Sequence, residues 1–175
     1  ILRGPERQRL EVTLTGREIN LARFPSLKIR PDGVGVLKIP NFDAPGQVGR
    51  RVHELVREAQ QKNVRALVLE LRGNSGGLLN EMILTAAAFL DDAYVALVDR
   101  YNTERTEFRI RDGRLTITRN GQTETANLPF LARWRGPLVV LIDGNTASGG
   151  EYLASAIQRA RVGPLVGVAT LGIGN

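Results

Sequence analysis

Apolar residues gather into short runs separated by glycine- and proline-rich turns along most of this chain. Residues 34–40 are mostly apolar and end at Pro40, which predicts a strand followed by a turn over 41–46. Between 47 and 62, apolar residues recur every three or four positions and charged residues fill the remainder, which predicts a helix with one face on a sheet. The nearly all-apolar residues 66–71 predict a strand buried on both faces of a parallel sheet.

The second half of the chain repeats this plan after an interruption. A mostly apolar helix is predicted over 78–90, and three strands are expected next, of which the last two are joined by the hairpin-favouring pair Asp112-Gly113. These strands cover residues 94–102, 107–111 and 114–119. A buried strand, a helix and a short strand then follow at residues 137–143, 147–159 and 165–168. This order predicts the α/β class, with a mainly parallel sheet and an antiparallel β insertion.

Residues 9–15, upstream of these elements, alternate apolar and polar side chains like a strand. No apolar run reaches the roughly 18–20 residues of a membrane-spanning helix, and the sequence opens at Ile1 without a signal-peptide pattern. The 175 residues, 42% of them hydrophobic, are enough for one domain with a substantial core. We therefore expect a soluble domain cut from a longer protein, not an integral membrane protein.

Composition excludes several classes of chemistry. The absence of cysteine rules out disulfides, thiolate metal sites and a thiol nucleophile, and one histidine without clustered carboxylates predicts no metal site and no cofactor. The net charge is +6, and 21 of the 24 basic residues are arginine. These arginines are dispersed among acidic residues and lack a nucleic-acid-binding motif, so they predict a solvated surface and no nucleic-acid partner.

A glycine-rich loop at residues 73–77 directly follows the strand predicted at 66–71. Open α/β sheets place their sites at the carboxyl ends of parallel strands, and consecutive glycines let backbone N–H groups approach a ligand. Gly76 and Gly77 are therefore candidate donors to an anion or an oxyanion at the start of a helix. The loop lacks the spacing of a dinucleotide site or a P-loop. A tight strand-to-helix turn without a ligand is the alternative.

Residues 142–151 show the same order of buried strand, small residues and helix. The small neighbours leave the hydroxyl of Ser148 open at a strand-to-helix turn, much as a nucleophile elbow presents its serine, although the G-x-S-x-G pattern is absent. Serine before a helix most often acts as an N-cap that accepts a backbone hydrogen bond. From this segment alone, the N-cap is the favoured interpretation and the nucleophile is the alternative.

Together, the two loops resemble the C-terminal (tail-specific) processing serine peptidases. That family carries a "DLRxNxGG" loop and an "SASASE" loop, which match residues 71–77 and 146–151 in order and spacing. The similarity runs over residues 35–174 and implies a ClpP/crotonase-like core of βαβ units. Residues 1–20 resemble the end of the PDZ domain that precedes this core in the family, with its connector. We therefore expect residues 21–175 to form the peptidase core, truncated at its C-terminus.

The resemblance implies a role for each matching residue. Ser148 falls on the family's nucleophile. The backbone N–H groups of Gly149, Gly76 and Gly77 fall on its oxyanion hole. The family's base, a lysine that takes the proton from serine, is replaced by Ile173, which has no ionisable group.

Two further residues bear on how the serine is activated. His53, the only histidine, lies beside the apolar positions of the helix predicted at 47–62. We expect a surface or core-edge role for it and no serine–histidine pair. An acidic residue that some family members carry after the helix glutamine is replaced by Arg159.

The leading hypothesis is a serine endopeptidase that cuts polypeptides near their C-termini through an acyl-enzyme on Ser148. The loss of the lysine motivates an alternative from another class, a catalytically inactive protein of this fold that binds peptides or apolar ligands, as related retinoid-binding repeats do. A crotonase-like enzyme is a third hypothesis, which rests on fold analogy alone. By resemblance, the protein acts on polypeptides outside the cytoplasmic membrane of a bacterium, in the periplasm or cell envelope.

Overall fold

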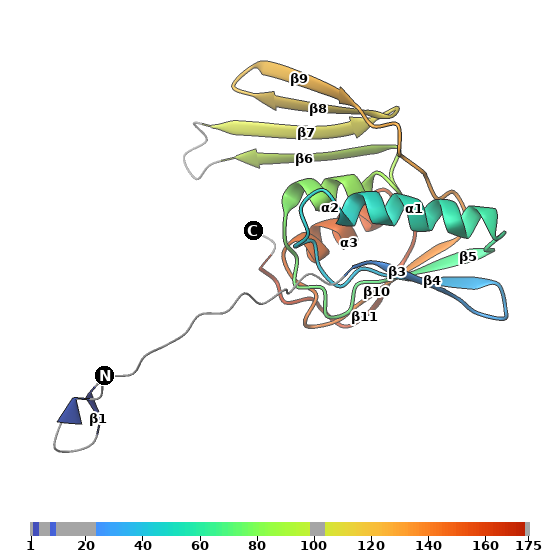
Figure 1. Cartoon of the computed structure of the whole chain (residues 1–175), viewed down its shortest axis with the longest axis horizontal. Coiled ribbons are helices and arrows are strands. Elements are labelled where there is room, and N and C mark those ends of the chain that lie inside the picture. The colour runs from blue at the N-terminus through green and yellow to red at the C-terminus, as the bar shows by residue number, and fades with distance from the viewer. Residues whose placement is uncertain (1, 4–7, 10–23, 99–103, 174–175) are drawn as a thin grey trace.

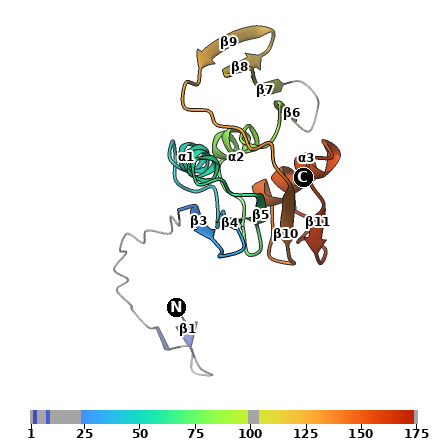
Figure 2. The ribbon, with the colours of Figure 1, turned by 90° about the vertical axis from the view of Figure 1, so that its right-hand side faces the viewer.

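The computed structural model describes residues 2–3, 8–9, 24–98 and 104–173. Two sheets enclose a layer of helices, with a five-stranded sheet on one side and a four-stranded sheet on the other (Figure 1). The view turned by 90° shows the same layers, and the described helices all lie on one face of the five-stranded sheet (Figure 2).

The five-stranded sheet has the strand order β11-β10-β5-β4-β3. Its strands are β3 (Ser26–Ile29), β4 (Val34–Lys38), β5 (Ala66–Glu70), β10 (Leu138–Ile142) and β11 (Leu165–Gly167). Only β3 is antiparallel to its neighbour, and the other four strands run parallel. The mainly parallel core expected from the sequence is confirmed, and β3 is an additional strand in a segment for which the sequence pattern predicts no element.

The helical layer consists of α1 (Val48–Gln61), α2 (Leu79–Ala86) and α3 (Gly149–Arg159). α2 lies between α1 and α3 and also contacts β6 and β7 of the second sheet. It ends four residues before the predicted limit at 90, because the chain tightens there into a turn in which Ala88 N–H donates to Thr85 O. The carbonyl of Ala88 accepts a hydrogen bond from Trp134 N, which fixes this turn against the segment that leads into β10.

The core lies between the helices and the five-stranded sheet. Leu67 and Leu69 of β5 are fully covered, whereas Ala66 and Val68 on the opposite face are half-buried. The prediction that this strand is buried on both faces was therefore wrong for the described part of the chain, because the helices cover a single face of the sheet.

The four-stranded sheet is antiparallel throughout and confirms the expected insertion. Its strands, in order, are β6 (Asp92–Val98), β7 (Arg105–Arg111), β8 (Arg114–Arg119) and β9 (Gln122–Asn127). All six positions of β9 are exposed, so it lacks the apolar alternation by which strands are recognised. A turn at Asn120-Gly121, with positive φ at both residues, joins it to β8.

The N-terminal region is described only in part. β1 (Leu2–Arg3) and β2 (Gln8–Arg9) pair antiparallel. The strand predicted at 9–15 lies mostly outside the described residues, and the division into a PDZ-like end and a peptidase core stays a prediction. Within the described residues, no helix combines the length and apolar character needed to cross a membrane.

Candidate active site

The two loops singled out from the sequence meet at one edge of the sheet. β5 and β10 are parallel neighbours, so the loop after each strand leaves the sheet on the same side. The N–H of Ala147 donates to Asn74 O at 2.8 Å, and the N–H of Gly73 donates to Asp143 Oδ1 at 2.9 Å. Each loop thus donates a backbone hydrogen bond to the other.

Buried polar groups stabilise this junction. The hydroxyl of Thr146 donates to Leu71 O at 2.9 Å and accepts a hydrogen bond from Asp143 N at 3.0 Å. The hydrogen bond from Gly73 N–H, with further donors at Asn145 and Thr146, holds the pKa of the Asp143 carboxyl below its ordinary value. Asp143 therefore stays ionised at neutral pH and serves as an anchor for the glycine-rich loop.

Asn74 shapes the glycine-rich loop from inside. Its side chain is fully buried, with Nδ2 donating to Ile39 O at 2.8 Å and Oδ1 accepting from Gly76 N at 2.8 Å. The second bond occupies one of the three N–H groups predicted for the oxyanion hole. Within the described residues, the N–H groups of Gly77 and Gly149 have no hydrogen-bond acceptor.

Ser148 occupies the N-cap position of α3 with φ 46° and ψ −118°. Such a backbone is uncommon for a residue with a side chain and costs about 1–3 kcal/mol, a cost met mainly at functional sites. The residue is half-buried and lies at the positive end of the α3 dipole. Ser148 is thus both the N-cap residue of α3 and a residue with the strained backbone that is expected of a nucleophile.

Gly76 lies directly against Ser148. A Cβ on Gly76 would lie 2.7 Å from Ser148 Cβ and 2.8 Å from Gly149 N, and its φ is +89°. Both distances are shorter than real Cβ contacts allow, and the Gly149 nitrogen belongs to the backbone. The loop therefore reaches the serine only because this position lacks a side chain.

Gly76→Ala is expected to lower the free energy of unfolding by about 2–4 kcal/mol, because the positive φ alone costs about 1–2 kcal/mol and the Cβ overlap adds to it. Urea denaturation measures the change. Gly73→Ala is the matched control, since Gly73 also has a positive φ, +73°, but has open space around a built Cβ. Equal losses in the two variants would show that the contact with Ser148 is unimportant for stability.

Phe42, from the turn after β4, supports both loops. Its N–H donates to Gly76 O at 2.7 Å, and its carbonyl accepts from Leu78 N at 3.0 Å. These bonds form an isolated parallel bridge between Phe42 and Gly77. The ring edge lies 3.1 Å from the position that a Cβ on Gly149 would take. Phe42 therefore fixes the backbone of Gly77 and Gly149 from behind.

Glu151 joins the serine to the segment that would carry the base. Its Oε2 accepts from Ser148 N at 2.8 Å and from Ile173 N at 3.1 Å, and its Oε1 accepts from Gly172 N at 2.7 Å. Position 173, which the resemblance predicts to be the base position, is thus brought beside Ser148 through a shared carboxylate. The Ile173 side chain is 56% exposed.

Burial raises the pKa of the Glu151 carboxyl, but hydrogen bonds from Thr170, Gly172, Ser148 and Ile173 outweigh it and hold the pKa below its ordinary value of 4.5. A depressed pKa stabilises the fold above 4.5, and this contribution is lost as the pH falls through the lower value of the folded state. We expect the difference in free energy of unfolding between wild type and Glu151→Gln to be constant from about pH 7 to pH 5 and to shrink below about pH 4.5.

Denaturation in urea at a series of pH values measures this difference. The other carboxylates with depressed pKa values are present in both proteins, so their contributions cancel. A difference that stays constant between about pH 5 and pH 3 would contradict the assignment.

His53 is fully buried, so the expectation of a surface or core-edge histidine was wrong. Its Nε2 lies 2.9 Å from Leu84 O, and its Nδ1 lies 2.8 Å from Ala132 O and 3.0 Å from Ala132 N. Burial is the main cause that lowers its pKa, so the ring is neutral at neutral pH. Both nitrogens are occupied by the backbone, and His53 is therefore a structural link and no base for Ser148.

The lysines offer no evident replacement for the missing base. Lys62 pairs with Glu58 at 2.7 Å at the end of α1, and Lys28 and Lys38 lie on β3 and β4. Among the residues that the structure describes, no cluster of three or more histidine, cysteine or acidic side chains could hold a metal ion.

Sequence reasoning missed the roles of Glu151 and Phe42. For Glu151 a signal was present, because a glutamate three residues after a serine at a helix start is the spacing of a capping box. For Phe42 no sequence signal existed, since its role depends on a contact with a loop more than 30 positions away.

Comparison with known proteins settles the family. Residues 33–175 match the sequence profile of peptidase family S41. The chain belongs to peptidase family S41. A carboxyl-terminal-processing protease of Synechocystis sp. is 31% identical over 170 residues, which cover 94% of this chain and 34% of that protein. A tail-specific protease of Haemophilus influenzae is 26% identical over 159 residues, or 90% of this chain and 20% of that protein.

The S41 fold is also found among solved structures. The photosystem II D1 C-terminal processing protease superposes with a TM-score of 0.58 at 23% identity, covering 83% of this chain and 34% of that one. This likeness shows the fold. The chain spans about a third or less of the length of the curated relatives it matches.

Proposed function

We propose that this S41 chain is the core of a serine endopeptidase that cuts polypeptides near their carboxyl termini, with Ser148 as the nucleophile. The observation that carries the proposal is the strained backbone of Ser148 at the start of α3, packed against Gly76 of the neighbouring loop. The names of the relatives, a carboxyl-terminal-processing protease and a tail-specific protease, support the choice of substrate class. By the same resemblance, we propose a location outside the bacterial cytoplasm.

In the proposed reaction, the Ser148 oxygen attacks the scissile carbonyl and the bond to the leaving amine breaks. The serine proton passes to that amine, and water then hydrolyses the ester on Ser148. The proposed oxyanion hole consists of the Gly149 N–H and the Gly76–Gly77 pair, in which the Gly77 N–H is the one without an acceptor in the described structure. The dipole of α3 adds to the stabilisation of negative charge there.

The proposed mechanism does not assign the group that accepts the proton from Ser148. Position 173 lies beside Ser148 through Glu151, but isoleucine accepts no proton. The proposed peptidase therefore either receives a base from outside the described residues or works slowly, with the oxyanion hole and substrate positioning as its remaining sources of catalysis.

The direct test is to trap the nucleophile in the full-length protein with a fluorophosphonate. The serine oxygen displaces fluoride at phosphorus, and mass spectrometry of the digested protein locates the adduct. We expect the adduct on the peptide that contains Ser148. A labelled protein whose adduct lies on another residue contradicts the assignment.

Ile173 favours a second candidate function, a protein that retains the peptidase fold and binds peptides or apolar ligands without cleaving them. An exposed apolar side chain at the position of the base is the observation behind it. A wild-type protein that binds unfolded polypeptides but neither cleaves them nor reacts with the fluorophosphonate would support this function over the first.

A further inference from the structure

The turn after β4 places a carboxylate against the glycine-rich loop. Asp43 follows Phe42, whose backbone forms a bridge with Gly77. A Cβ on Gly77 would lie 2.6 Å from Asp43 Oδ1, so this oxygen lies against the Gly77 backbone. A Cβ is about 2.5 Å from the backbone nitrogen of its own residue, which puts Asp43 Oδ1 within about 5 Å of Gly77 N. The carboxylate therefore borders an N–H group of the proposed oxyanion hole.

The usual structural roles of an aspartate in a turn are not open to Asp43. Such an aspartate commonly accepts a hydrogen bond from the backbone two residues on, but that residue here is Pro45, which has no N–H. The helix that follows, α1, begins without a side-chain cap. Asp43 is exposed, and its carboxylate forms no hydrogen bond or ion pair with the described residues.

Three other carboxylates on the segments that build the site are all engaged. Asp143 and Glu151 each accept at least two backbone hydrogen bonds. Glu81 of α2 is fully buried, and it accepts from two backbone N–H groups near the start of α1. Asp43 differs from these three, because its contact with Gly77 is not explained by stabilisation of the turn.

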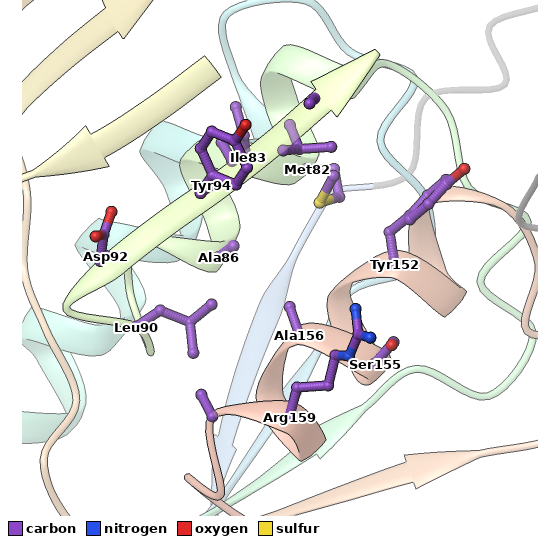
Figure 3. Close-up of a pocket in the computed structure, with 13 residues that line it drawn as sticks. Met82, Ile83, Ala86, Leu90, Asp92, Tyr94, Tyr152, Ser155, Ala156 and Arg159 are labelled. Carbon is purple, nitrogen blue, oxygen red and sulfur yellow. The ribbon is translucent and has the colours of Figure 1, made fainter. Parts of the chain in front are cut away.

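The acidic residue in the cavity beside α3 is also paired. This cavity, of about 520 Å³, lies between α2, α3 and β6, and Asp92 is part of its lining (Figure 3). Asp92 Oδ1 accepts from Arg109 Nε at 2.7 Å. Neither Asp43 nor Ser148 belongs to this lining. The carboxylate that is left without a partner among the described residues is thus the one at the proposed oxyanion hole.

A carboxylate in this place opposes the proposed reaction unless a cation neutralises it. Attack by Ser148 puts negative charge on the scissile oxygen, which would lie about 3 Å from Gly77 N. That oxygen is then within about 8 Å of the Asp43 carboxylate, and two like charges at this distance repel each other most where water is excluded. A cation of the substrate that pairs with Asp43 removes this repulsion.

We infer that Asp43 selects substrates with a lysine or arginine close to the cleaved bond, by an ion pair between that side chain and the Asp43 carboxylate. The inference rests on the proposed peptidase function and adds a specificity-determining residue to it. An extended peptide rises about 3.3 Å per residue, and lysine carries its charge on a flexible four-carbon stem. A basic residue within about two positions of the scissile bond therefore reaches Asp43.

The test uses a labelled, unfolded peptide and its variants with lysine, norleucine or glutamate at successive positions. Mass spectrometry locates the cleaved bond, and kcat/KM is measured with the full-length protein. We expect lysine near that bond to be favoured over norleucine by about threefold to fivefold at low salt, and glutamate to be disfavoured to a similar degree. At about 0.5 M salt the preference should shrink, because ions screen an exposed pair.

Asp43→Asn should bring the ratio of lysine to norleucine to about one. It should also raise kcat/KM for the norleucine peptide about twofold to threefold, because the repulsion of the oxyanion is removed. Loss of a merely structural residue would not produce this gain. Asp112→Asn is the matched control, since Asp112 is an exposed aspartate in the turn between β7 and β8 of the other sheet. It should change neither quantity.

A preference for lysine that survives Asp43→Asn overturns the inference, as does an equal loss in Asp112→Asn. Hydrolysis without any charge preference refutes the role of Asp43 and leaves the peptidase function standing. If no peptide is hydrolysed, the peptidase function is refuted, and fluorescence anisotropy with the full-length Ser148→Ala protein decides on Asp43. Tighter binding of lysine peptides that is lost with Asp43→Asn then keeps the cation site, and equal binding of all peptides refutes it.

Discussion

Ser148→Ala is expected to reduce hydrolysis of an unfolded polypeptide by the full-length protein at least about 10³-fold, because it removes the attacking oxygen from the proposed reaction. It should also abolish the fluorophosphonate adduct. Alanine and serine both carry a Cβ, so the substitution leaves the cost of the positive φ at this position nearly unchanged. The measurement is the initial rate of peptide release at several protein concentrations, with urea denaturation as the check on folding.

Ser26→Ala provides the matched control, because Ser26 is an exposed serine on the antiparallel edge strand β3. It should leave both hydrolysis and labelling at the wild-type level. A Ser148→Ala protein that remains folded and hydrolyses peptides at the wild-type rate would refute the assignment of the nucleophile.

Ile173→Lys is expected to increase Ser148-dependent hydrolysis, since it places an amine on the segment that Glu151 holds beside the serine. General-base catalysis contributes about 10²–10⁴-fold when the base is unprotonated. Position 173 is largely exposed. A lysine there therefore keeps a pKa near its ordinary value of about 10.4 and is mostly protonated at neutral pH. The gain should accordingly be small at pH 7 and reach at least about tenfold at pH 9.

Leu171→Lys tests whether position 173 itself matters. Leu171 is 55% exposed in the same segment, and its N–H donates to Thr146 O at 3.0 Å, so its side chain is a comparable surface site. We expect no gain from this variant at any pH. Equal gains from the two lysines would show a general effect of charge. A gain in Ile173→Lys that persists in the double variant with Ser148→Ala would contradict catalysis by the serine.

The buried elements of the fold followed from the sequence because their apolar patterns are local. The strands β4, β5 and β10 and the helices α1 and α3 bury side chains at the spacing that their positions in the sheet or helix require. Parallel strands order their loops at one edge, so the meeting of the Gly76 and Ser148 loops was also predictable from the strand assignment.

The elements that sequence reasoning missed are those with few buried side chains. β9 exposes every side chain, and its existence depends on backbone pairing with β8 and on the turn at Asn120-Gly121. That dipeptide was a usable signal. The burial of His53 had no such signal, because both of its partners are backbone groups distant in sequence, at Leu84 and Ala132.

Within the site, the sequence predicted which residues meet but not how they are held. The hydrogen bond that engages Gly76 N–H depends on the side chain of Asn74, two positions earlier. The hydrogen bonds that Glu151 accepts from Gly172 and Ile173 depend on where the chain after β11 returns to α3. These two bonds are consequences of tertiary packing, which residue spacing does not encode.

The positive φ of Ser148 also limits which residues evolution can substitute there. A β-branched side chain at φ 46° is strongly disfavoured, so threonine, the other common hydroxyl nucleophile, does not suit this backbone. A lineage that abandons catalysis is free to drift toward glycine, which tolerates a positive φ combined with ψ −118° more readily than residues with a side chain. In descendants of this fold, a small residue at position 148 therefore reflects the backbone geometry of the turn. Only a hydroxyl group at this position indicates that the nucleophile has been retained.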